Sequence, residues 1–132
     1  MSLGIKDKTF IFQGFGAVGY WAAKFLEKDG AKITTVVEYN SAIHNPKGLC
    51  VESVKAHMTK HGSLASYPHA TEVIVENPQS FLLKQADCMI PAAIEKSLHA
   101  GNAEQIQVKA IFEGANGPTT YAAEKIFQRR GI

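Results

Sequence analysis

Three glycines and one acid stand at a spacing that suits the binding of a diphosphate and a sugar. The glycine motif G-x-G-x-x-G comprises Gly14, Phe15, Gly16, Ala17, Val18 and Gly19. In this pattern the first glycine permits a tight turn, the second lets a pyrophosphate approach the backbone, and the third lets a helix pack closely on a strand. The free N–H groups and partial positive charge of a helix N-terminus then bind the pyrophosphate without a lysine.

Glu38 supplies the second half of the pattern. It follows Gly19 by nineteen residues, close to the spacing of about 20 expected for the acid that accepts hydrogen bonds from the adenosine ribose. A carboxylate at this position accepts two hydroxyl hydrogen bonds but repels a 2′-phosphate. The pattern therefore favours NAD, with NADP less favoured.

Other interpretations of the glycine motif exist. The glycines alone are also compatible with a purely structural turn, and Glu38 with a solvated strand end. An S-adenosylmethionine site competes as well, because related sheets use a glycine turn and an acidic strand end. A P-loop is excluded, since no glycine in the chain precedes Lys-Ser or Lys-Thr.

The elements around the motif are those that it requires. Thr9–Phe12 is apolar and β-branched or aromatic, which predicts a buried strand. Apolar residues then recur at helical spacing, with Val18, Ala22, Phe25 and Leu26 on one side. Gly30 fits the left-handed position that ends a helix, and residues 33–37 form a second predicted strand. The unit is β-α-β.

The same alternation of strands and helices continues to the end of the chain. We predict a turn at 45–48, followed by a helix that carries Val51, Val54 and Met58 and ends at His61-Gly62. An edge strand at 73–75 and a helix from Asn77-Pro78 to about Lys84 come next. Strands at 88–90 and 110–112 and a last helix capped by Thr120 complete the predicted order. This order predicts the α/β class. We expect a single domain with a Rossmann-like, doubly wound, mostly parallel open sheet and helices on both faces.

Composition excludes several classes of function. A formal net charge of +2 gives no electrostatic reason to expect nucleic acid or an anionic membrane as partner, and no apolar run is long enough to span a membrane. Cys50 and Cys88 have no paired spacing and are expected to be reduced thiols. The five histidines show neither metal nor triad spacing and are expected at the surface or in turns. We predict no metal site and no catalytic residue.

Three loops should lie at the carboxyl ends of the strands, where open α/β sheets bind ligands. They begin at Glu38, Pro91 and Glu113. The small residues Ala92 and Ala93 would let a flat nicotinamide ribose lie against the backbone, and Asn116 offers an amide donor and acceptor. By their residue types alone, the last two loops are equally compatible with simple turns.

Four segments, in the family's order and spread along nearly the whole chain, resemble the coenzyme domain of the glutamate dehydrogenase family. They are QGFGAVG at 13–19, NPKG at 45–48, IPAA at 90–93 and, most specifically, EGANGPTT at 113–120. The resemblance implies that Gly14 to Gly19 bind the pyrophosphate, that Glu38 binds the adenosine ribose, and that Ala92, Ala93 and Asn116 surround the nicotinamide ribose.

The chain departs from the family at two places. Ala17 stands where asparagine is common, which removes a side-chain contact. Tyr39, with Asn40 and Ser41, replaces smaller or more acidic residues. Tyr39 is compatible with stacking beside adenine and equally with an exposed strand end.

The resemblance implies a parent enzyme that converts L-glutamate to 2-oxoglutarate and ammonia with NAD. We expect residues 1–132 to be its NAD(P)-binding domain, with residues 1–4 an artificial start and the substrate domain absent, so that the isolated chain is inactive. The parent is expected to be a homohexamer in the cytoplasm or the mitochondrial matrix. Two alternatives are the same domain of a leucine, valine or phenylalanine dehydrogenase, and a non-catalytic dinucleotide-binding module.

Overall fold

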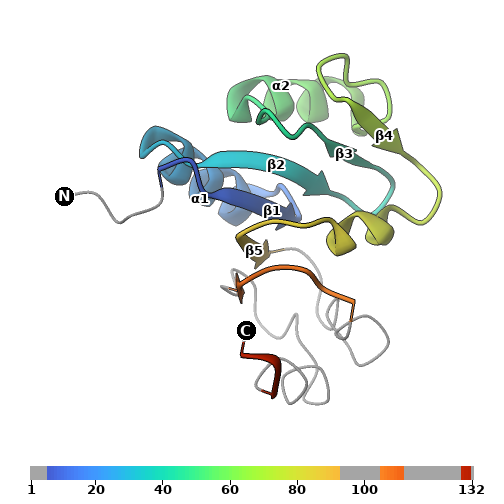
Figure 1. Cartoon of the computed structure of the whole chain (residues 1–132). Coiled ribbons are helices and arrows are strands. Elements are labelled where there is room, and N and C mark those ends of the chain that lie inside the picture. The colour runs from blue at the N-terminus through green and yellow to red at the C-terminus, as the bar shows by residue number, and fades with distance from the viewer. Residues whose placement is uncertain (1–5, 93–104, 112–128, 132) are drawn as a thin grey trace.

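The structure is a computed structural model that describes residues 6–92, 105–111 and 129–131. Strands and helices alternate along the chain, as Figure 1 shows. Their bounds are β1 Thr9–Gln13, α1 Ala17–Lys28, β2 Lys32–Val37, β3 Ala42–His44, α2 Val51–His61, β4 Glu72–Ile74, the 3-10 helix η1 Pro78–Leu83, β5 Cys88–Pro91 and β6 Ala110–Ile111. The predicted last helix from Thr120 lies outside the described residues.

The strands form one mixed sheet in the order β4-β3-β2-β1-β5-β6. The four strands β2, β1, β5 and β6 are parallel, whereas β3 pairs antiparallel with both β2 and β4. The prediction of an α/β sheet with a parallel centre is confirmed. Strand β3 was not predicted; it follows β2 after residues 38–41 only, a connection too short for a crossover, so it returns as a hairpin.

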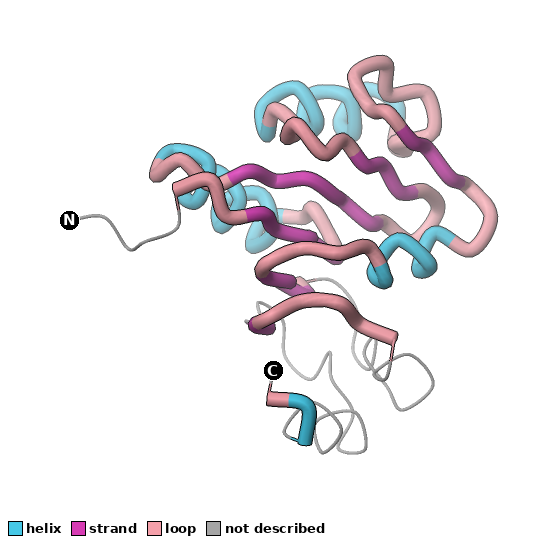
Figure 2. Tube along the Cα trace, in the orientation of Figure 1, coloured by secondary structure: helices cyan, strands magenta, loops and turns pink. Residues whose placement is uncertain are grey.

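Helices cover the two faces of the sheet unequally. Along β1, Phe10 and Phe12 point into the core beneath α1 and α2, while Ile11 points to the opposite core beneath η1. Figure 2 shows the long helices on one side of the strands and the short η1 helix near the other. The central strand is therefore buried on both faces, which agrees with its continuous apolar sequence.

The predicted core face of α1 was wrong in part. Val18 and Phe25 are 57% and 68% exposed, whereas the residues buried beneath the helix are Gly19 and Ala23. Gly19 and Ala23 are four residues apart and small, so the helix backbone lies close to the strands. Ala22 and Leu26 of the predicted face are partly buried against the core, whereas Val18, Trp21 and Phe25 project outwards.

The second correction concerns η1. The sequence predicted a helix from Asn77-Pro78 to about Lys84, and the segment is a 3-10 helix over Pro78–Leu83. Asn77 has φ +49° and its side chain makes no capping hydrogen bond. The proline at the first helical position was predicted correctly, since its fixed φ suits that place and no N–H is needed there.

The ends of the two α-helices agree with the sequence analysis. Gly30 and Gly62 follow α1 and α2 with φ of +94° and +69°, values that glycine adopts without a Cβ penalty. In the residues that the structure describes, no helix has the length and apolar character that crossing a membrane requires.

Candidate functional site

The glycine turn connects β1 directly to α1. Gly14 has φ +96° and donates its N–H to the carbonyl of Val37 at 2.8 Å, which ties the turn to the end of the neighbouring strand β2. Gly16 is the N-cap residue of α1 and makes no side-chain capping bond, and the first turn of the helix carries no acidic residue. No side chain of the cap or of the first turn therefore compensates the positive end of the helix dipole.

The second and third glycines of the motif face different surroundings. A Cβ added to Gly16 would meet no atom within 4 Å, so the space beside it is open. A Cβ on Gly19 would lie 2.3 Å from the carbonyl oxygen of Gly14 and 3.7 Å from the Cβ of Ala92. Gly19 is therefore required by the packing of the helix on the turn, whereas no contact among the described residues requires Gly16.

Glu38 lies against the glycine turn. It follows β2 immediately, and its Oε1 accepts a hydrogen bond from the N–H of Phe15 at 2.5 Å. Its own N–H donates to the carbonyl of Ser41 at 2.8 Å, which fixes the start of the loop. The acid and the glycines, separated by more than one element in sequence, belong to a single corner of the molecule.

The environment of Glu38 opposes its charge. Burial raises the pKa of this carboxyl above its ordinary value, while the hydrogen bond from Phe15 and the nearby Lys55 ammonium act in the other direction. Within the described ranges Oε1 is the oxygen that is hydrogen-bonded, and Oε2 accepts no bond. A half-buried carboxylate with one unused oxygen is well placed to accept hydrogen bonds from a hydroxyl group.

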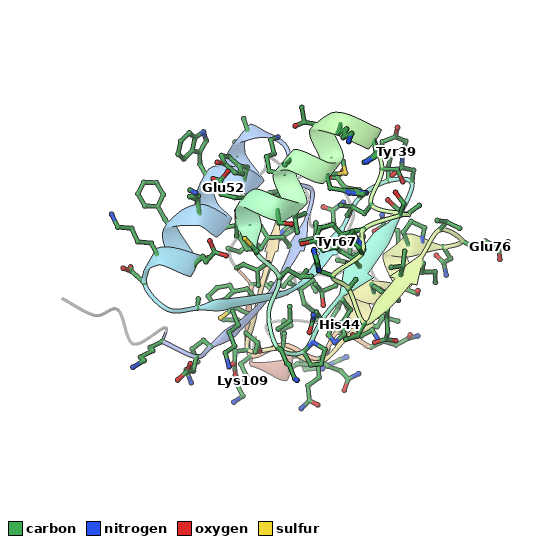
Figure 3. All side chains as sticks on the ribbon, turned by 90° about the horizontal axis from the view of Figure 1, so that it is seen from above. Tyr39, His44, Glu52, Tyr67, Glu76 and Lys109 are labelled. Atoms are coloured by element: carbon green, nitrogen blue, oxygen red, sulfur yellow. The ribbon has the colours of Figure 1, made fainter. Side chains whose placement is uncertain are left out.

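The other predicted site residues are placed to different degrees. Tyr39 is 72% exposed, and Figure 3 shows it at the rim of the molecule near the end of α2. Ala92 follows β5 and donates its N–H to the carbonyl of Gln13 at 2.7 Å, which holds it at the same edge as the turn. Ala93 and Asn116 lie outside the described residues.

Lys55 is a residue near the turn that the sequence analysis did not single out. Its Nζ donates to the carbonyl of Phe15 at 3.4 Å and lies 5.5 Å from the centre of the Tyr20 ring. The sequence analysis assigned no role to any lysine. Its position four residues after the buried Val51 places it on the inner side of α2, and that spacing was the available signal.

A second polar contact joins the two helices beside the turn. Glu52 of α2 accepts a hydrogen bond from the Tyr20 hydroxyl and forms an ion pair with Lys24, both from α1. Figure 3 shows Glu52 between the two helices. These contacts keep the pKa of Glu52 below its ordinary value, the hydrogen bond from Lys24 being the main cause. The start of α1 is thereby fixed relative to α2.

The histidines agree only partly with the sequence analysis. His44 is half-buried in β3, and its Nδ1 lies 2.7 Å from the Thr35 hydroxyl, so it is neither a surface nor a turn residue. His57 stacks on His61 with ring centres 4.3 Å apart. Among the described residues, no group of three or more potential ligands is arranged to hold a metal ion.

The chain is similar to known proteins over nearly its whole length. The family described as Glutamate/Leucine/Phenylalanine/Valine dehydrogenase matches residues 1–132. A mitochondrial glutamate dehydrogenase of Dictyostelium discoideum is 44% identical over 97% of this chain and 25% of its own length. A glutamate dehydrogenase of Thermotoga maritima is 42% identical over 98% of this chain and 31% of its own length.

Solved structures give the same result for the fold. A hetero-hexameric glutamate dehydrogenase from Thermus thermophilus has a TM-score of 0.86 and 26% identity, covering 98% of this chain and 30% of that one. A glutamate dehydrogenase from Peptoniphilus asaccharolyticus has a TM-score of 0.73 at 26% identity, covering 97% and 28%. The chain spans about a quarter to a third of the length of these relatives.

Proposed function

The chain belongs to the Glutamate/Leucine/Phenylalanine/Valine dehydrogenase family, and from this premise we propose that it is the coenzyme-binding domain of an NAD-dependent glutamate dehydrogenase. The parent enzyme would convert L-glutamate, water and NAD to 2-oxoglutarate, ammonium and NADH. The family description also includes leucine, phenylalanine and valine enzymes. The curated relatives named above are glutamate dehydrogenases, which favours glutamate.

The observation that carries the proposal is the hydrogen bond from Phe15 N–H to Glu38 Oε1. It brings a carboxylate onto a glycine turn at the carboxyl edge of a parallel sheet, which is where dinucleotides bind in Rossmann-like, doubly wound folds. A structural turn beside a solvated acid would not require the acid to be half-buried against the backbone of that turn. The arrangement therefore supports a ligand site.

The pyrophosphate of the coenzyme is assigned to the start of α1. The open space beside Gly16 admits a phosphate close to the backbone, and the uncapped helix N-terminus offers N–H donors and a partial positive charge. Ala17 contributes its backbone N–H only. Gly14 and Gly19 shape the turn rather than contact the ligand.

The adenosine ribose is assigned to Glu38. Its Oε2, which accepts no hydrogen bond within the described part of the chain, would accept one from the 2′-hydroxyl. The negative charge disfavours a 2′-phosphate, so we propose a preference for NAD. Names of relatives do not decide this point, since one at 34% identity is an NADP-specific glutamate dehydrogenase of Halobacterium salinarum. Tyr39 lies at the rim, where adenine would be placed.

The nicotinamide end is assigned to Ala92, Ala93 and Asn116. Ala92 supports this assignment, since it lies at the same edge as the turn and beside Gly19. The bound coenzyme supplies the hydride-transfer chemistry, and the chain's residues hold its ring in position. We assign no catalytic residue to this chain and expect it to lack glutamate oxidation activity alone.

The relatives also support a proposal for the assembly and the location of the parent enzyme. The Thermus thermophilus structure is hetero-hexameric, which supports a hexameric parent of related subunits. One relative is named mitochondrial and the other above is bacterial. We propose the cytoplasm or the mitochondrial matrix.

Calorimetric titration of the chain with NAD, NADP and S-adenosylmethionine tests the proposal. We expect NAD to bind, NADP to bind more weakly and S-adenosylmethionine not to bind. Glu38→Ala should weaken NAD binding by about tenfold to a hundredfold, because hydrogen bonds to a charged group contribute about 1.5–3 kcal/mol. The substitution should also reduce the difference between the affinities for NAD and NADP.

Glu38→Gln is the matched control. It retains an oxygen for the N–H of Phe15 and removes only the charge, so the turn should keep its shape while the preference for NAD decreases. Binding of S-adenosylmethionine in place of NAD, or a NAD affinity unchanged by both substitutions, would contradict the proposed site.

A further inference from the structure

Lys55 reaches the glycine turn from the helix α2. The helix α2 presents it from the position one turn after Val51, which is fully buried. Its Nζ reaches the carbonyl of Phe15 at 3.4 Å, and the N–H of the same residue is bound by Glu38. The backbone of one residue of the turn, Phe15, thus contacts both a carboxylate and a cation.

The charge of Lys55 is not neutralised by an ion pair. Lys24, Lys84 and Lys109 each pair with a carboxylate within 4 Å, whereas in the described part of the chain Lys55 forms no such pair. Its contacts are the long bond to a carbonyl and the Tyr20 ring. The ammonium is still close enough to Glu38 to stabilise the ionised carboxylate.

We propose that Lys55 is a specificity-determining residue that contacts the 2′ position of the adenosine ribose and lets the site accept NADP beside NAD. The inference rests on the proposed function, because it assigns Lys55 to the same dinucleotide site. Glu38 alone would exclude a 2′-phosphate by repulsion. The pair of Glu38 and Lys55 has no net charge, and the flexible lysine stem carries three donors that suit a phosphate.

The nearby Glu52 does not hold the Lys55 ammonium in another contact. Glu52, one turn ahead on the same helix, is held by Tyr20 and Lys24 and does not compete for the ammonium. The bond from Lys55 to Phe15 is at the long limit for a hydrogen bond and so is weak. A 2′-phosphate would replace it with a shorter bond in which donor and acceptor both carry charge.

Titration of the whole chain with NAD and with NADP, in parallel for several variants, tests the inference. Lys55→Met keeps the aliphatic stem over Tyr20 and removes the charge. We expect its NADP affinity to fall about tenfold to a hundredfold, as for one charge-assisted hydrogen bond, while its NAD affinity changes by less than about threefold. Lys55→Arg, which keeps the positive charge, should bind NADP about as well as the unaltered chain. Lys60→Met, on the exposed side of α2, should change neither affinity.

The outcomes separate this inference from the proposed function. If the unaltered chain binds both coenzymes and Lys55→Met leaves their ratio unchanged, the inference is overturned and the dinucleotide site stands. An equal loss for NAD and NADP would place Lys55 at the pyrophosphate and also overturn it. Binding of NAD without measurable NADP binding rejects the role in NADP acceptance, and binding of neither coenzyme rejects both proposals. Circular dichroism of each variant confirms that it is folded.

Discussion

A carboxylate at each edge of the central sheet accepts a hydrogen bond from a backbone N–H at one end of β1. The surroundings of the two carboxylates differ, however. At the carboxyl edge Glu38 accepts the N–H of Phe15, and at the amino edge Asp87 accepts the N–H of Thr9 at 2.9 Å. Burial raises the pKa of Glu38, whereas the hydrogen bond from the Thr9 N–H lowers that of Asp87.

The difference lies in how many partners each carboxylate has. Asp87 also accepts the Thr9 hydroxyl at 3.2 Å, and its Oδ1 lies 3.5 Å from the Lys109 ammonium. Glu38 keeps one oxygen unbonded in the described residues. The protein itself therefore supplies donors to both oxygens of Asp87, whereas Glu38 keeps one oxygen for a donor from a ligand. This contrast indicates a structural role for Asp87 and supports the proposed role of Glu38 in binding the ribose.

The largest effect is expected at the glycines of the carboxyl edge. Gly19→Ala places a Cβ against the carbonyl of Gly14 and should lower the free energy of unfolding by about 1–3 kcal/mol, as overpacking does. Gly16→Ala should cost only about 0.5 kcal/mol, the loss of a better helix N-cap residue, but should weaken NAD binding at least about tenfold. Urea unfolding and calorimetry measure the two effects, and equal destabilisation by both would show that the whole turn is structural.

Replacing each carboxylate by the amide of the same shape should affect the stability of the fold in different ways. Asp87→Asn removes the charge from three contacts and should lower the free energy of unfolding at pH 7 by about 1–2 kcal/mol. Glu38→Gln relieves the burial of a charge and should leave stability unchanged or raise it. Urea denaturation of both variants checks this, and a large loss of stability for Glu38→Gln would remove the distinction between the edges.

The smallest effect is expected in the pH dependence. Because the folded-state pKa of Asp87 is lowered, its contribution to stability is present above about pH 3.9 and is lost as the pH falls below that value. Because that of Glu38 is raised, its ionisation costs stability as the pH rises from about 4.3 through the folded pKa.

Unfolding of the two neutralised variants and the unaltered chain between pH 3 and 8 separates these contributions. The deficit of Asp87→Asn should decrease as the pH falls below about 3.9, and any advantage of Glu38→Gln should appear only above about pH 4.3. A Glu38→Gln advantage that persists at pH 3 would have a cause other than the charge.

The sequence predicted the parts of the fold that depend on local pattern. The unit of β1, α1 and β2 and the ends of both α-helices follow from apolar runs and glycines. Two features were missed because they depend on tertiary packing. Strand β3 is only Ala42–His44, too short to give a periodicity, and the buried side of α1 consists of Gly19 and Ala23, which carry little apolar signal.

Part of the candidate site could also be predicted from the spacing of residues in the sequence. Glu38 was identified by its distance from Gly19, and the structure places it on the glycine turn. Lys55 was missed because a lysine on an amphipathic helix resembles any solvated charge. Only the packing of α2 beside Phe15 and Tyr20 distinguishes it.

The most direct test of which edge binds NAD is to follow the backbone amide resonances of the ¹⁵N-labelled chain by NMR during a titration with the coenzyme. The amino edge offers a rival position, a hollow of about 500 Å³ that Thr9, Asp87, Lys109 and Arg130 help to line. We predict that the amides of Gly14, Phe15, Gly16 and Glu38 shift and that those of Thr9, Asp87 and Lys109 do not. Shifts confined to the amino edge, or none at saturating NAD, would contradict the account.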